Sequence, residues 1–347
     1  MKSAFPVLLF FLTLGLLLVS RASALGGGSP VRYRVAGQEK AVALLTGGKA
    51  TYLVTEKTVL RRRGRQFAPV YHSAAPIRCA LLTDTTLWLG TQQGLLQVST
   101  RSGQAQPLNP AGPGIVAPVT ALLQDATGAV WVGMAGYGVY QQRQGAWQAQ
   151  LNIPTLNAGL ATADSAVWIA TNIGLYQWQH QQWTRYNEEG VANHEIPDNL
   201  VEKLLPDGGG NMWVLMSEGL SCFAWAASTA ASEPPLSTVK YLGRPGNEVY
   251  SVAQLPGQGY LFATALGLLL LPTEPASEVR NQAPAATDQV QNRAALVPVT
   301  LPGPAAVPDL LHVDARHRIW VMQPGQVSVW RRKDFSAAAQ PAATSRR

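Results

Sequence analysis

The stretch Asn199-Leu-Val-Glu-Lys-Leu-Leu-Pro-Asp-Gly-Gly-Gly-Asn-Met-Trp-Val-Leu-Met-Ser-Glu-Gly-Leu220 decides the fold. It joins an apolar segment to an Asp-led, glycine-rich turn, then to a second apolar segment centred on Trp213 and to a Gly-Leu pair that opens a third. An Asp side chain can bond its own backbone and Gly tolerates positive φ, so both residues favour tight turns. The stretch therefore predicts a series of β-hairpins.

The central apolar segment of this stretch recurs along the chain. The copies are Leu87–Thr91, Val130–Met134, Val167–Thr171, Met212–Met216, Tyr260–Thr264 and Ile319–Gln323, with a weaker copy at Thr51–Thr55. Their anchor residues, which are Trp in five copies, follow one another at steps of 36, 43, 37, 45, 48 and 59 residues. A β-pattern with a period near forty residues is typical of β-propellers.

Seven copies predict the architecture. The chain has 347 residues, including 32 Gly and 24 Pro, which favours many short strands over a mixed fold. We expect an all-β, seven-bladed β-propeller with four-stranded antiparallel blades. The seventh repeat is one strand short, whereas Pro30–Val35 lies outside the first repeat and alternates like a strand. We predict that this N-terminal strand completes the last blade, which closes the ring and removes an exposed edge.

The first 24 residues have the features of an export signal. Lys2 precedes an apolar run from Phe5 to Val19, and Ala22-Ser-Ala24 offers small residues at a cleavage point. We assign residues 1–24 to a signal peptide, 25–335 to the propeller and 336–347 to a disordered tail. An uncleaved membrane anchor is the alternative for the first segment. The mature chain is expected to be a periplasmic or secreted monomer without a membrane span.

Residues 199–220 and 119–140 resemble the two-component regulator propeller repeat, and residues 80–96 and 160–176 resemble it in part. The first, sixth and seventh copies are degenerate: Thr58 stands where the repeat has Gly, and Leu261 where it has Trp. Such propellers usually form the periplasmic sensing part of bacterial hybrid histidine kinases. The resemblance implies a free-standing, exported, non-catalytic binding or sensing propeller in a two-component signalling context. Its partner would be a small ligand, a glycan or an envelope protein.

A propeller enzyme is the competing hypothesis, because propellers also host lyases that group His and carboxylates around a metal. His312 stands where the first strand of the seventh repeat should approach the axis. A metal-assisted lyase or hydrolase would need His312 to converge with Glu202, Glu248 or Asp309. We expect no catalysis, metal or cofactor, because the sequence shows neither a nucleophile motif nor a phosphate loop. Five acidic residues instead recur at what we interpret as one structural turn: Asp84, Asp125, Asp164, Asp207 and Asp314.

Four residues are candidates for ligand binding. His312 could line the channel, Tyr137 lies in an enlarged turn, and His194 and Glu195 belong to the irregular loop 187–197. The tryptophans that recur at one register are expected to pack between neighbouring blades instead.

The remaining charge and cysteine patterns are less specific. The net charge is +7, with local excess at Arg61–Arg65, Arg331–Lys333 and Arg346–Arg347. Export argues against nucleic acid as a partner, and these runs fit solvated strands; a specific polyanion site is the alternative. The two cysteines, Cys79 and Cys222, fall in the second and fifth repeats, too far apart across a ring for a disulfide. We predict two free thiols.

Overall fold

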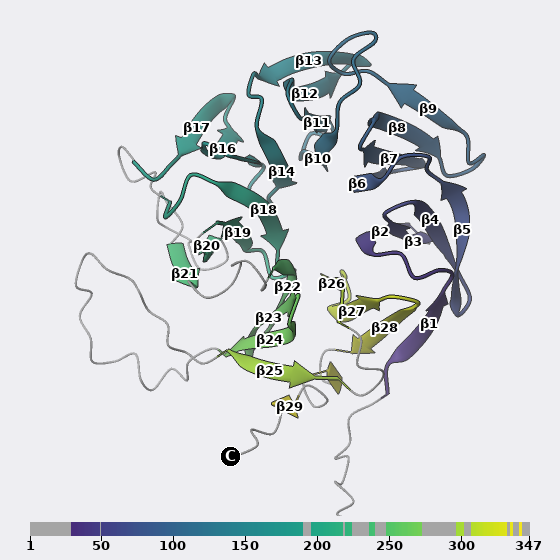
Figure 1. Cartoon of the computed structure of the whole chain (residues 1–347). Coiled ribbons are helices and arrows are strands. Elements are labelled where there is room, and N and C mark those ends of the chain that lie inside the picture. Colours follow the sequence, from purple (N-terminus) through teal and green to yellow (C-terminus); the bar gives the residue numbers. More distant parts are fainter. Residues whose placement is uncertain are drawn as a thin grey trace, which may run out of the picture.

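The computed structural model describes residues 29–48, 50–189, 196–217, 219–223, 236–239, 248–272, 296–301, 307–331, 334–335 and 340–341. The described elements are all β-strands, arranged as four-stranded antiparallel blades around a central axis (Figure 1). None of the described segments forms a helix that could cross a membrane. The segments assigned above to a signal peptide lie outside the described residues.

The blades follow the chain in order. Blade 1 contains β2 (Ala41–Gly47), β3 (Ala50–Thr55), β4 (Thr58–Arg63) and β5 (Gln66–His72). Blade 2 contains β6 (Ile77–Thr83), β7 (Thr86–Thr91), β8 (Gly94–Ser99) and β9 (Ala105–Leu108). Blade 3 contains β10 (Val119–Gln124), β11 (Val130–Met134), β12 (Gly138–Arg143) and β13 (Ala146–Leu151). Blade 4 contains β14 (Leu156–Ala161), β15 (Val167–Thr171), β16 (Gly174–Gln179) and β17 (Gln182–Tyr186).

The later blades include the irregular ones. Blade 5 contains β18 (Val201–Pro206), β19 (Met212–Met216), β20 (Gly219–Phe223) and β21 (Leu236–Val239). Blade 6 contains β22 (Val249–Leu255), β23 (Gly259–Thr264), β24 (Gly267–Pro272) and β25 (Val297–Thr300), and β29 (Gln340–Pro341) adds a short fifth strand. Blade 7 contains β26 (Leu310–Val313), β27 (Arg318–Gln323), β28 (Gln326–Arg331) and, as its outer strand, β1 (Val31–Val35).

The ring of blades is closed in the described part of the chain. Each innermost strand contacts the innermost strand of the next blade, in the order β2, β6, β10, β14, β18, β22 and β26, and β26 contacts β2 again. The seven-bladed propeller predicted from the repeats is therefore the fold.

Strand β1 closes the ring as predicted. It pairs antiparallel with β28, with Val31 opposite Val329. It also pairs in parallel with β5, where Arg34 lies opposite Gln66, and this second pairing joins blades 7 and 1 into one eight-stranded sheet. The sequence analysis did not predict the parallel pairing. Because β1 bonds on both sides, neither outer strand next to it presents a free edge along those paired residues.

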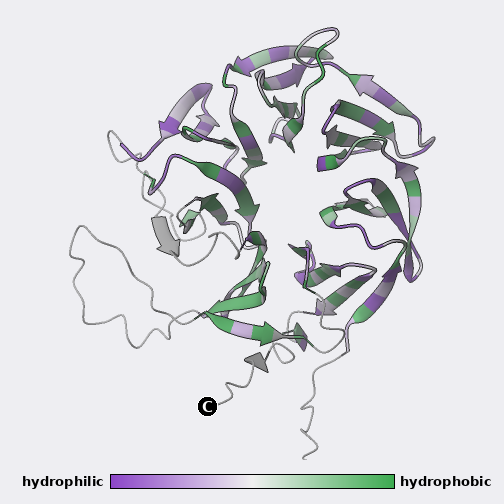
Figure 2. Ribbon diagram, in the orientation of Figure 1, coloured by the Kyte–Doolittle hydropathy of each residue, from purple (hydrophilic) through white to green (hydrophobic). Residues whose placement is uncertain are grey.

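The recurring tryptophans form the core between blades, as predicted. Trp131, Trp168, Trp213 and Trp320 are at most 1% exposed. Each packs on the following blade; for example, the ring of Trp168 in β15 lies 5.7 Å from that of Phe223 in β20. Burying such a side chain removes roughly 200 Å² from water and contributes about 5 kcal/mol. Figure 2 shows the hydrophobic residues concentrated on the strands and the hydrophilic ones in turns and outer strands.

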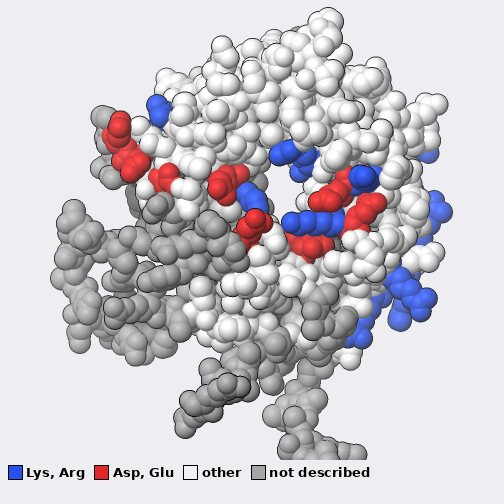
Figure 3. Space-filling model, viewed as in Figure 1, with Lys and Arg blue, Asp and Glu red and all other residues white. Residues whose placement is uncertain are grey.

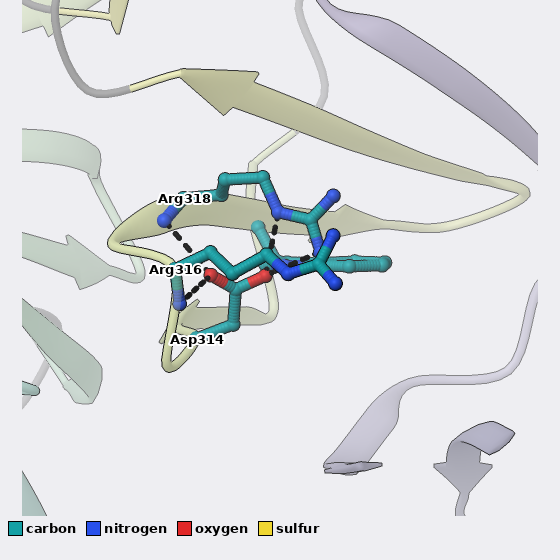
Figure 4. Close-up of polar contacts among 4 residues, drawn as sticks. Asp314, Arg316 and Arg318 are labelled. Atoms are coloured by element: carbon teal, nitrogen blue, oxygen red, sulfur yellow. Dashed lines mark hydrogen bonds and ion pairs between the residues drawn. The ribbon is translucent and has the colours of Figure 1, made fainter. Parts of the chain in front are cut away.

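In blades 3 and 7 the carboxylate of the Asp-led turn accepts a hydrogen bond from the tryptophan. Trp131 Nε1 donates to Asp125 Oδ2 at 2.7 Å, and Trp320 Nε1 donates to Asp314 Oδ2 at 2.9 Å. Asp314 also accepts the backbone N–H and the guanidinium of Arg318 (Figure 4). These carboxylates are therefore structural, as the sequence suggested.

The single explanation given for all five acidic residues is wrong in two turns. Asp84 and Asp164 lie four residues before the Trp of their blade, whereas Asp125, Asp207 and Asp314 lie six residues before it. The indole then bonds a threonine hydroxyl: Trp88 Nε1 donates to Thr83 Oγ1 at 2.8 Å, and Trp168 Nε1 donates to Thr162 Oγ1 at 3.1 Å. In blade 5 the spacing is six, but Asp207 Oδ2 accepts from Asn211 Nδ2 at 2.7 Å, and Trp213 Nε1 has no hydrogen-bond partner in the described part of the chain.

The two cysteines are free thiols, in blades 2 and 5 respectively. Burial raises the pKa of each thiol to about 12. Neither is a reactive nucleophile at neutral pH, because the thiolate is the reactive species.

Candidate functional site

The first residues of the innermost strands meet at one mouth of the central channel. Hydrogen bonds join the start of one innermost strand to the start of the next: Asn157 Nδ2 donates to Val201 O at 2.7 Å, and Lys203 Nζ donates to Val249 O at 3.2 Å. Ala41 N likewise donates to Asp309 Oδ2 at 3.3 Å. Side chains that begin these strands therefore gather around the axis.

This mouth is charged. Figure 3 shows acidic and basic side chains side by side around the central opening. The residues that define it, which we call the axial mouth, are Lys40, Lys203, Glu248, Tyr250 and Asp309, from blades 1, 5, 6 and 7.

Tyr250 in β22 is the centre of the axial mouth. The ammonium of Lys40 lies 4.2 Å from the centroid of its ring, and that of Lys203 lies 5.8 Å from it. Lys40 belongs to blade 1 and Tyr250 to blade 6, so Lys40 extends across the start of blade 7. Each cation is attracted to the aromatic face, and the ring holds two positive charges near one another.

Burial tunes the charges of the axial mouth. It is the main cause that lowers the pKa of Lys203, and the Lys40 cation lowers it further, whereas Glu248 and Glu202 oppose the change. Burial also raises the pKa of Asp309, with help from Glu56, against the opposing Ala41 N–H and Lys40. A half-buried cation and a half-buried carboxylate with shifted pKa values in one opening are typical of binding sites.

Glu39 stands beside Lys40 and is already satisfied. Its carboxylate accepts hydrogen bonds from the hydroxyls of Thr55 and Thr58 and from the backbone N–H of Lys57. Burial acts to raise the pKa of Glu39, but these hydrogen bonds outweigh it and the pKa is lowered. Glu39 therefore fixes the start of β2, which positions Lys40.

Of the predicted binding residues, His312 is the nearest in the sequence to a residue of the axial mouth, Asp309. It is half-buried in β26 and pairs with Trp320, so its side chain lies on the same face of the sheet as that indole. Burial lowers the pKa of His312, and the Asp314 carboxylate opposes this. Among the described residues, no three His, Cys, Asp or Glu side chains form a group that could hold a metal ion.

Of the other predicted residues, only Tyr137 lies among the residues that the structure describes. Tyr137 is 43% exposed in the turn between β11 and β12. This turn is on the same face as the axial mouth, because Met134 at the end of β11 pairs with Val119 at the start of β10. His194 and Glu195 lie outside the described residues.

The sequence analysis did not single out Lys40, Lys203 or Tyr250 as site residues. One signal was present: Glu202-Lys203 interrupts an apolar segment that was predicted to be an innermost strand. A charged side chain is rarely buried in an apolar core, so at the start of an innermost strand it is expected to face the central channel. That reasoning also needs the positions of neighbouring blades, which a single sequence does not provide.

Comparison with known proteins supports the fold. No protein-family model matches the sequence, and no curated protein matches it. The extracellular domain of the putative one component system BT4673 from B. thetaiotaomicron is 14% identical with a TM-score of 0.61, over 88% of this chain and 40% of that one. A catalytically inactive virginiamycin B lyase from Staphylococcus aureus is 9% identical with a TM-score of 0.59, over 86% of this chain and 97% of the lyase.

A third similar structure is that of YCF48 bound to D1 peptide, which is 13% identical with a TM-score of 0.54, over 90% of this chain and 99% of that one. This chain thus spans about two fifths of the BT4673 structure and nearly the whole of the other two. At these identities the likeness shows the fold alone. The chain has the β-propeller fold that extracellular domains of two-component systems, a lyase and a peptide-binding protein also have.

Proposed function

We propose that this protein is an exported recognition propeller without chemistry of its own, which binds a small zwitterionic ligand at the axial mouth in a signalling context. One observation carries the proposal: the ammonium groups of Lys40 and Lys203 converge on Tyr250 beside Glu248 and Asp309. The two cations suit a carboxylate, and the two acids suit an ammonium group. A free amino acid or a whole dipeptide carries both.

The similar structures favour sensing over catalysis. Several are extracellular domains of putative two-component systems, and in YCF48 the propeller has a bound peptide. An exported sensor would also agree with the signal-like residues 1–24. The chain covers only about two fifths of those two-component structures, so signalling would pass through a partner or another segment.

The competing hypothesis is a metal-assisted lyase or hydrolase centred on His312. The likeness to the virginiamycin B lyase is the observation in its favour. Burial lowers the pKa of His312, so its imidazole is neutral at pH 7 and has a lone pair for a metal. His312 is not one of the residues that define the axial mouth, so substitution of His312 and of Lys203 separates the two hypotheses.

The test is a thermal-shift and calorimetric screen of the protein against amino acids, dipeptides and divalent metals. A ligand that binds only the folded state at 100 times its Kd stabilises it by about 2.7 kcal/mol. We expect a dipeptide to do so, K203M to abolish the effect, and K57M, which removes a nearby exposed cation, to preserve it. A shift caused by a metal alone and lost in H312A would replace this proposal with the enzyme.

A further inference from the structure

A basic cavity lies at the seam where blade 7 meets blade 1. Its volume is about 640 Å³, and its lining includes the ends of β1, of the β4–β5 hairpin and of the β27–β28 hairpin. Four of the lining residues are arginines: Arg32, Arg34, Arg63 and Arg65. The amide side chains of Gln66 and Gln326 lie among them.

The backbone brings these arginines to one end of the seam. Arg63 pairs with Gln66 across a two-residue turn, and Gly64 supplies the positive φ of 61° that this turn requires. Arg34 in β1 pairs with the same Gln66 from the other side, and its N–H donates to Arg65 O at 3.2 Å. The arginines therefore belong to the strands that close the ring.

The basic surface continues onto blade 2. A second cavity of about 250 Å³ lies there, and its lining includes Arg61, Arg63 and Arg101. Arg63 lines both cavities, so they adjoin. In the described part of the chain, no Asp or Glu lines either cavity. Figure 3 shows a group of basic side chains at the lower right edge, over β1 and β5 of Figure 1.

This arrangement has an electrostatic cost that an anion would remove. Like charges held near one another repel, and the repulsion here acts between β1 and the hairpin to which it is bonded. Guanidinium groups bind phosphate oxygens through two parallel hydrogen bonds, which makes arginine suitable for such anions. A series of arginines along adjoining cavities suits an anion with several charged groups in a row.

We propose that this surface, the arginine seam, binds a linear phosphate-bearing polyanion that clamps strand β1 in the closed ring. A bilayer surface is flat, whereas the arginines line cavities along the outer rim. Single-stranded nucleic acids bind through exposed aromatic rings on which bases stack. At the arginine seam Tyr33 and Tyr52 are buried and Tyr71 is half-buried, which favours a chain without bases.

The proposal is independent of the axial mouth, because the two sites share no residue. Its probe is short-chain inorganic polyphosphate, titrated into the protein at several salt concentrations. We expect R63Q/R65Q to weaken binding about tenfold or more and to reduce the slope of log K against log salt by about two. The matched control R143Q/R316Q removes two exposed arginines elsewhere and should change affinity less than about twofold.

A second measurement tests the clamp. Hydrogen exchange of the β1 amides should slow when polyphosphate binds, while exchange in blades 3 and 4 should not change. Equal weakening in both double variants would show that only net charge attracts the anion and would overturn the site. Tighter binding to single-stranded DNA or to anionic vesicles than to polyphosphate would overturn the ligand class, and unchanged β1 exchange would overturn the clamp.

Discussion

The carboxylate of Asp125 accepts five hydrogen bonds in a turn that supports the core. Its Oδ1 accepts hydrogen bonds from Thr127 N at 2.9 Å, from Thr127 Oγ1 at 2.6 Å and from Ala129 N at 3.0 Å. Its Oδ2 accepts from Trp131 Nε1 at 2.7 Å and from Gln141 Nε2 at 2.9 Å. Trp131 and Gln141 are buried, so water cannot replace these two bonds.

The substitution D125N keeps the shape of this side chain but replaces one oxygen with an amide N–H₂ group. At least two donors then lose their acceptor, and each hydrogen bond to a charged group is worth about 1.5–3 kcal/mol. Gln141 cannot simply turn its oxygen toward the new amide, because that oxygen accepts from Arg143 Nε at 2.6 Å. With some relaxation of the turn, we expect the free energy of unfolding to fall by about 2–4 kcal/mol.

Urea unfolding followed by tryptophan fluorescence measures this loss as a lower midpoint with an unchanged slope. D84N is the matched control, because in that turn Trp88 bonds Thr83 and not the acid. Asn also tolerates the positive φ of 44° at position 84. We expect D84N to stay within about 0.5 kcal/mol of the natural sequence. Equal losses in the two variants would refute the assignment of the hydrogen bonds.

The same carboxylate predicts a pH dependence. Burial acts to raise the pKa of Asp125, but hydrogen bonds from Thr127, Trp131 and Ala129 outweigh it, so the pKa is lower in the folded protein. Its stabilisation is therefore complete above the unfolded pKa of about 3.9 and is lost as the pH falls through the lower folded value. Stability should fall more steeply with acid in the natural sequence than in D125N.

Three further predictions concern the stability and burial of the propeller. Deleting residues 29–36 removes β1, so we expect an open ring that aggregates in size-exclusion chromatography; a soluble monomer with native far-UV circular dichroism would contradict the closure. W168A should lower the free energy of unfolding by about 3–5 kcal/mol, because Trp168 is fully buried, whereas W147A, at a half-buried ring, should cost less; equal losses in a denaturation series would be evidence against core packing between blades. Cys79 and Cys222 should react with a thiol reagent at pH 8 only after urea unfolding, because burial raises both pKa values to about 12; rapid labelling of the native protein would contradict this.

The strands and blades of the propeller could be predicted because the sequence patterns that specify them are local. The recurring segments expected at 87–91, 130–134, 167–171 and 212–216 are strands β7, β11, β15 and β19, which lie at 86–91, 130–134, 167–171 and 212–216. Turn residues and alternating apolar residues determine such segments over a few positions. Ring closure was also predictable, because the seventh repeat has three strands and residues 30–35 form a strand that belongs to no repeat. Pairing the two completes the last blade.

The candidate site consists of residues that lie far apart in the sequence and come together only in the folded ring. The axial mouth joins Lys40, Lys203 and Tyr250, which are separated by long stretches of sequence and belong to three blades. The repeat pattern does not predict them, because none of the three residues belongs to the set of positions that recur from blade to blade. The basic run at Arg61–Arg65 was visible, but its meeting with Arg32 and Arg34 follows from the parallel pairing of β1 with β5, which the repeats do not encode.

The pairing of β1 with β28 also fixes the order in which this molecule can be completed. Val31 and Val329 lie about 300 residues apart, so β1 finds its antiparallel partner only after the strands between them have been synthesised. Blades 1 to 5 are contiguous segments and can form earlier from local hairpins. Until β28 is present, β1 has at most its short parallel contact with β5, and its other edge is open to any extended chain nearby. Ring closure therefore requires β28, and until then the free edge of β1 is exposed to misassembly.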